Sequence, residues 1–200
     1  MKRLLVLALA PLLLAACDRK PAAPAPAPAA TVATPTPPKP TPPADAANFQ
    51  HDAALDLSGF YFTDAEVKSG NWKLKSLNIG APSDFAAWED GKRPSQYGPI
   101  FLEFEDVTSP TAVNELGQTN HTVSFRLLPD SYRVDGHQVV FHAKDARIGE
   151  VVLSGVMDVA KLQAAKTDGP SGGPRPVLTG DLQIGADRIR NLSFVYFPGE

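Results

Sequence analysis

The stretch SYRVDGHQVVFHA, residues 131–143, decides the fold class of this chain. Its first half alternates polar residues with Tyr132 and Val134, and its second half is a further apolar run. Alternation at every second position is typical of a strand with one buried face. Asp135-Gly136 separates the two runs, and such a pair is the strongest short-range signal for a hairpin with a type I′ turn. We therefore predict two antiparallel strands joined by a two-residue turn at Asp135-Gly136.

The same alternation of apolar and polar residues continues on both sides of this hairpin. Turn signals separate the runs, at Lys144-Asp145-Ala146-Arg147 and again at Gly185-Ala186-Asp187. Short strands with regular turn signals indicate an antiparallel all-β domain. The other runs that we expect to be strands are residues 71–79, 99–107, 121–127, 150–157, 177–184 and 189–197.

Helical signals are few. Ser83 is a candidate cap for a short helix over residues 84–90, with Gly91 ending it, and Asp158 for a second helix over 159–166. The expected fold is mainly β. We predict an antiparallel meander that forms a curved sheet, a sandwich or a partly closed barrel, with one or two short helices.

Residues 48–200 form a single domain by length. The first 47 residues hold five of the 19 basic and two of the 22 acidic residues, which leaves 14 basic and 20 acidic residues for the domain. An acidic domain repels phosphate backbones, so no nucleic-acid partner is expected.

A proline-rich segment precedes this domain. Ten of the 20 prolines lie between Pro21 and Pro43, and Val32 is the only large aliphatic residue from 21 to 47. A segment of this composition buries too little apolar surface to offset the entropy that it would lose on folding. Its alternating Pro and Ala residues favour the extended polyproline II conformation. At about 3.1 Å per residue, the segment could hold a domain roughly 80 Å from its attachment point.

The N-terminus begins with Lys2 and Arg3 and continues with an apolar run, residues 4–14. This run is shorter than the roughly 20 residues that a membrane-spanning helix needs. A basic start, a short apolar core and small residues before a cleavage point describe a secretory signal peptide, here residues 1–16.

Leu14-Ala15-Ala16-Cys17 follows that run and contains the only cysteine of the chain. These residues resemble the lipobox of bacterial lipoproteins at every position. The resemblance implies cleavage between Ala16 and Cys17, a diacylglycerol thioether on Cys17, and a tether over residues 17–47. It places the domain in the periplasm of a bacterial cell envelope, anchored to a membrane. Asp18 favours the inner membrane, as in enteric lipoproteins, with the outer membrane as the alternative.

Catalytic motifs are weak. His137 and His142 stand five apart in one predicted strand and so face opposite sides, which argues against a shared metal ion. Glu103 and Glu105 share a strand face at a spacing that glycosidases also use, although a solvated strand face has the same pattern. His142 with Asp145 is another candidate pair, of a base and the group that orients it. We expect no enzyme activity, metal or cofactor.

The triplet Phe60-Tyr61-Phe62 leaves two interpretations open. In the first, Tyr61 faces solvent, opposite to its two neighbours, and forms a binding patch with Trp88 and Tyr97. In the second, the fold covers both sides of the segment.

The sequence therefore predicts a lipid-anchored envelope protein whose non-enzymatic domain binds another macromolecule. A protein partner is favoured. The organisation of lipobox, Pro/Ala tether and small β domain is similar to that of inhibitor or immunity lipoproteins, and an envelope assembly factor is a second version. The alternative is a carrier or sensor that holds a lipid or another apolar ligand in a β cavity.

Overall fold

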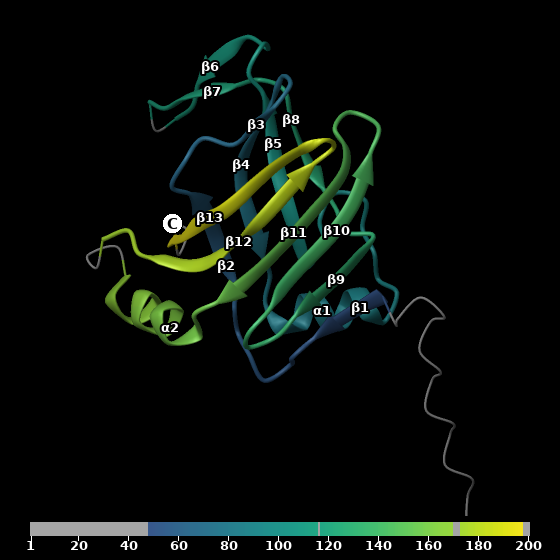
Figure 1. Ribbon diagram of the computed structural model, residues 1–200, viewed down its shortest axis with the longest axis vertical. Coiled ribbons are helices and arrows are strands. Elements are labelled where there is room, and N and C mark those ends of the chain that lie inside the picture. The colour runs from purple at the N-terminus through teal and green to yellow at the C-terminus, as the bar shows by residue number, and fades with distance from the viewer. Residues whose placement is uncertain (1–47, 116, 170–172, 198–200) are drawn as a thin grey trace, which may run out of the picture. The chain divides into compact units, whose positions relative to one another are not determined.

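The structure is a computed structural model that describes residues 48–115, 117–169 and 173–197. The predicted signal peptide, Cys17 and the tether lie outside the described residues. Within them, the prediction of a mainly β domain with two short helices is confirmed (Figure 1). The helices are α1 (Pro82–Glu89) and α2 (Val159–Asp168). The strands are β1 (Phe49–His51), β2 (Gly59–Thr63), β3 (Lys68–Ser69), β4 (Trp72–Ile79), β5 (Ile100–Asp106), β6 (Thr111–Val113), β7 (Thr119–His121), β8 (Ser124–Leu127), β9 (Ser131–Val134), β10 (Val139–Asp145), β11 (Gly149–Met157), β12 (Pro176–Ile184) and β13 (Asp187–Phe197).

Eleven of these strands form one sheet in the order β1-β9-β10-β11-β12-β13-β2-β4-β5-β8, with β3 beside β4. Neighbouring strands are antiparallel except β1 and β9, which are parallel. The edge strand β8 contacts β10, which lies close to the opposite edge of the sheet. The sheet is therefore curled into a half-barrel. Strands β6 and β7 form a separate small hairpin (Figure 1).

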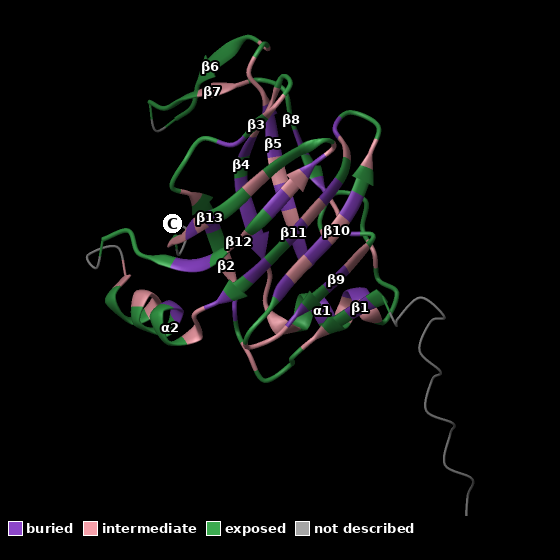
Figure 2. Cartoon of the chain, viewed as in Figure 1, coloured by how far each residue is buried: buried purple, intermediate pink, exposed green. Residues whose placement is uncertain are grey.

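One face of the curled sheet, here called the inner face, forms the core. Tyr61, Leu77 and Leu102 lie side by side on β2, β4 and β5, and all three are fully buried. Buried and exposed residues alternate along the strands (Figure 2). Because residues from β4, β5, β9 and β10 belong to one apolar cluster, the sheet must curve around a single core. The opposite side is called the outer face below.

The predicted hairpin between β9 and β10 is confirmed, but the prediction of a type I′ turn at Asp135-Gly136 is wrong. Asp135 N donates to Gln138 O at 2.9 Å, so the two linking residues are Gly136 and His137, and neither has a positive φ. The Asp135 carboxylate accepts hydrogen bonds from His137 N and Gln138 N, each at 2.8 Å. These bonds stabilise a turn with Asp at its first position, as in type I turns.

Of the two predicted N-cap residues, one is confirmed and the other is wrong. Asp158 caps α2 as expected, since its side chain accepts from Lys161 N at 3.0 Å. The prediction of Ser83 as the cap of α1 is wrong, because the helix already begins at Pro82. Proline fits the first helical position, where its missing N–H is not needed. Asp84 closes this helix start by accepting from Ala81 N at 2.8 Å.

Candidate functional site

The predicted binding patch of Tyr61, Trp88 and Tyr97 is not an exposed surface. Tyr61 is 0% exposed and Trp88 is 6% exposed, whereas Tyr97 is 54% exposed. The alternation within the triplet is as predicted, but its faces are reversed. Phe60 and Phe62 are 44% and 39% exposed, so the fold does not cover both sides either.

Tyr61 is buried because β2 lies in the interior of the sheet, between β13 and β4. Tyr61 lies between Leu77 of β4 and Tyr196 of β13, and its hydroxyl donates to the Leu57 carbonyl. That bond satisfies the hydroxyl, so the ring can be buried without an unpaired polar group. Burial raises the pKa of Tyr61, and the nearby Tyr196 and Asp56 raise it further.

A cleft of about 530 Å³ lies over the outer face of β2, β4 and β5. Phe60, Asn78 and Phe101 are cross-strand neighbours in one row and line this cleft. The segment from α1 to β5, residues 90–99, borders the cleft, and the Tyr97 ring centre lies 6.5 Å from that of Phe101. Trp88 of α1 also lines it. Trp88 and Tyr97 of the predicted patch thus border one cleft, while Tyr61 does not.

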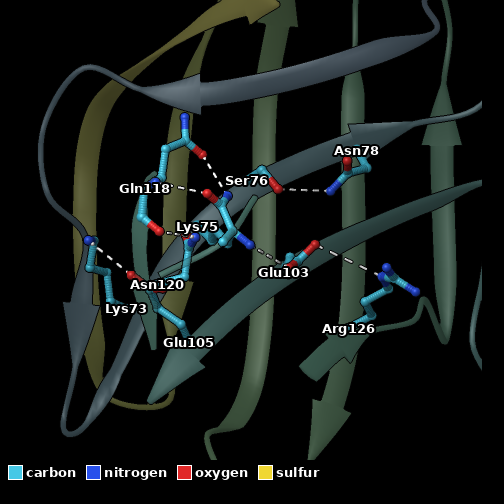
Figure 3. A network of polar contacts seen from close by, with 10 residues as sticks. Lys73, Lys75, Ser76, Asn78, Glu103, Glu105, Gln118, Asn120 and Arg126 are labelled. Carbon is cyan, nitrogen blue, oxygen red and sulfur yellow. Dashed lines mark hydrogen bonds and ion pairs between the residues drawn. The ribbon is translucent and has the colours of Figure 1, made fainter. Parts of the chain in front are cut away.

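Charged side chains continue along the outer face from the cleft (Figure 3). Glu103 pairs with Lys75 at 3.1 Å and lies 3.9 Å from Arg126, and Glu105 pairs with Lys73 at 3.0 Å. The two glutamates share a face, as predicted. Each is held by cations of its own face, which is the arrangement of a structural ion-pair network rather than of a paired acid and base.

Arg126 also borders the cleft and contacts its rings. The guanidinium carbon lies 4.3 Å from the Tyr97 ring centre and 5.5 Å from that of Phe101. This cation–π contact holds the exposed Tyr97 ring against the sheet. The cleft therefore has ordered aromatic walls and a charged rim.

Two buried polar atoms of the cleft residues are unsatisfied. Among the described residues, neither Asn78 Oδ1 nor Trp88 Nε1 has a hydrogen-bond partner. The other amide atom of Asn78, Nδ2, donates to Ser76 Oγ at 3.0 Å, so the unsatisfied atom of this amide is its oxygen. An unsatisfied buried polar group costs about 1–3 kcal/mol. Such groups beside a cleft are unusual and call for an explanation.

A second polar cluster joins β1, α1 and β9, and no local pattern in the sequence predicted it. Glu89 Oε1 lies 2.8 Å from His51 Nδ1 and accepts from the Tyr132 hydroxyl at 3.0 Å. The His51 ring stacks on Phe85. Burial and the adjacent Glu89 raise the pKa of Tyr132. These residues lie 38 and 43 positions from Glu89, so only the fold brings them together. The cluster fixes β1 to the first helix.

The other candidate pairs are not formed. His142 pairs with Glu150 across the β10–β11 hairpin at 3.0 Å, while Asp145 binds Arg147 at 2.7 Å. The hydrogen bond from Arg147 lowers the pKa of Asp145. His137 lies in the β9–β10 turn and not in a strand. His142 and Asp145 therefore do not form the candidate pair of a base and its orienting group.

Across the part of the chain that the structure describes, no group of three or more His, Cys, Asp or Glu side chains is arranged to hold a metal ion. In that same part, none of the helices has the length and apolar character to cross a membrane. Comparison of the chain with family models, with curated proteins and with solved structures gave no match.

Proposed function

We propose that this chain is a lipid-anchored protein of the bacterial cell envelope whose β domain binds another macromolecule without catalysing a reaction on it. The anchor follows from the lipobox resemblance at Cys17. The binding site is the outer-face cleft of Phe60, Asn78, Trp88, Tyr97 and Phe101. An inhibitor of an envelope-attacking enzyme and an envelope assembly factor both fit this organisation.

The observation that carries the proposal is an aromatic-walled cleft with two unsatisfied polar atoms at its lining residues. Binding sites are concave, are lined mainly by apolar and aromatic groups, and have a few polar groups that fix orientation. Aromatic residues also dominate the energetics of interfaces. The exposed Phe62 and Phe197 rings, 5.9 Å apart on the same side of β2 as Phe60, extend the apolar surface beyond the cleft.

The buried aromatic side chains on the inner face of the half-barrel favour this function over that of a carrier. Tyr61, Phe104, Phe141 and Phe194 are all fully buried on the inner face. An apolar ligand carried inside a β cavity requires open space between the strands. The cleft on the outer face offers space where a macromolecule can approach it.

Site-specific photo-crosslinking in cells tests the proposal. A photoreactive phenylalanine analogue replaces Tyr97 in the full chain, and a control chain carries it at Val156, which is exposed on β11 and does not border the cleft. We expect a discrete adduct from position 97 and its loss when Phe60→Ser is added. Once the partner is purified, Tyr97→Ala should weaken binding by about 2 kcal/mol. Identical adducts from both positions would contradict the proposal.

A further inference from the structure

The geometry points to a ligand class for the cleft: an N-acetylated amino sugar of the cell-wall glycan. This inference rests on the proposed function, because it names the macromolecule that the cleft binds. It begins from the two unsatisfied atoms, an acceptor at Asn78 Oδ1 and a donor at Trp88 Nε1.

An acetamido group complements these two atoms. Asn78 Oδ1 requires an N–H, and the Trp88 indole N–H requires an acceptor such as a carbonyl oxygen. A secondary amide offers one of each within a single planar unit. Neither atom exposes surface to water. Contact with a ligand therefore requires both side chains to rotate toward the cleft, and the free energy lost to the two unsatisfied groups is recovered when the amide binds.

The aromatic walls complement the sugar ring. Phe60, Phe101 and Tyr97 line the cleft, and the C–H faces of a pyranose are apolar and pack on such rings. Lys92, Glu103 and Arg126 also line it and supply donors and acceptors for hydroxyl groups. The combination of apolar walls and a polar rim suits a ligand with apolar faces and hydroxyls along its edges.

The size of the cleft favours a short stretch of glycan over a protein surface. A volume of about 530 Å³ lies within the range of roughly 300–1,000 Å³ that is typical of small-ligand sites. A stable protein interface covers about 800 Å² on each partner and is usually flatter. A peptide bond offers the same donor and acceptor as an acetamido group, so a peptide must be tested beside the sugar.

Tryptophan fluorescence of the detergent-solubilised full chain provides the test. The chain has two tryptophans, so Trp72→Phe leaves Trp88 as the only one. The probes are triacetylchitotriose, its deacetylated form, cellotriose and the amide of acetyl-trialanine. We expect a saturable change in Trp88 emission with triacetylchitotriose, and binding at least about tenfold weaker for the three other probes.

Variants assign the binding to the cleft. Asn78→Leu removes the unsatisfied acceptor at similar volume, so it should weaken binding of triacetylchitotriose about tenfold. It also removes the hydrogen bond to Ser76, so the melting temperature is measured beside the affinity to show that the variant is folded. Trp88→Phe, measured by calorimetry, should weaken binding to a similar extent because only the indole N–H and part of the ring are lost. Val156→Ala is the control, since Val156 is exposed on β11 and does not line the cleft, and it should leave binding unchanged.

The outcomes separate this inference from the proposed function. No saturable response to triacetylchitotriose up to about 10 mM overturns the inference. Equal binding of cellotriose overturns the acetamido assignment, and equal binding of the peptide shows that the cleft is a peptide site. If crosslinks from position 97 still capture a protein in any of these cases, the proposed function stands and only the sugar is wrong.

Discussion

Tyr61 illustrates how one side chain depends on its neighbours in the sheet. It is flanked by Phe60 and Phe62, yet it alone of the three enters the core. Its hydroxyl donates to the carbonyl of Leu57 only four residues earlier, which makes burial of this phenol possible. The polar atom is satisfied locally, and the ring fills the space between β13 and β4.

This burial predicts loss of stability at alkaline pH. The pKa of Tyr61 is raised in the folded state, so the native protein keeps the proton at a pH where the unfolded chain, with a pKa of about 10, releases it. The contribution is fully present below pH 10 and is lost as the pH rises above it, by up to about 1.4 kcal/mol per pH unit. Urea unfolding between about pH 9 and pH 11 measures this decline.

Tyr61→Phe isolates the contribution of this hydroxyl. The variant should lose about 1–2 kcal/mol at neutral pH, because the Leu57 carbonyl loses its donor, but its alkaline decline should be shallower. Tyr97→Phe is the control, since its exposed ring should leave the slope unchanged. Equal slopes for Tyr61→Phe and the parent chain would show that another group, such as the buried Tyr132, causes the decline.

At the scale of elements, the close pairing of β11 and β12 depends on two glycines. Gly155 and Gly180 are cross-strand partners in the pairing of β11 with β12. A Cβ on Gly180 would overlap the Ser154 carbonyl oxygen and lie 2.5 Å from the Gly155 Cα. Both atoms belong to the backbone, so no side-chain rotation can relieve the contact.

We therefore expect Gly180→Ala to destabilise the domain by about 1–3 kcal/mol in urea unfolding. Gly155→Ala is the matched comparison. Its new Cβ would first meet Leu178 Cδ1 at 2.8 Å, which is the end of a flexible side chain, and then the Thr179 carbonyl oxygen at 3.1 Å. Gly155→Ala should therefore lower the free energy of unfolding by less than Gly180→Ala does. A larger loss at Gly155 than at Gly180 would contradict this account of the strand contact.

At the scale of the whole molecule, the proposed anchor is testable through a single residue. Cys17 is the only cysteine, so Cys17→Ser removes the only thiol that can carry a diacylglycerol. We expect this variant to retain the mass of the uncleaved precursor and to incorporate no labelled palmitate, whereas the parent chain is labelled. Two or more acyl chains are needed for stable membrane attachment, so the variant should also lose lipid-dependent retention. Palmitate labelling of the variant at the parent level would contradict the anchor.

Much of the β architecture follows from local sequence signals. The two-residue period predicts the strands and which residues share a face, because side chains alternate along any strand. Asp158 predicts the start of α2, and Gly185, with a φ of 56°, predicts the β12–β13 turn. Each of these features depends on residues within a few positions of one another, so composition and spacing are sufficient.

Features that depend on contacts between residues far apart in the sequence were decided only by the tertiary structure. The period could not tell which face of β2 is buried, because β13 and β4 provide the contacts that bury Tyr61. The turn after β9 depended on the Asp135 carboxylate and not on the Asp-Gly pair alone. The cleft needs Phe60, Asn78 and Phe101 from three strands and Trp88 from a helix. Curling of the sheet and pairing of its strands bring such residues together, and a one-dimensional pattern contains neither.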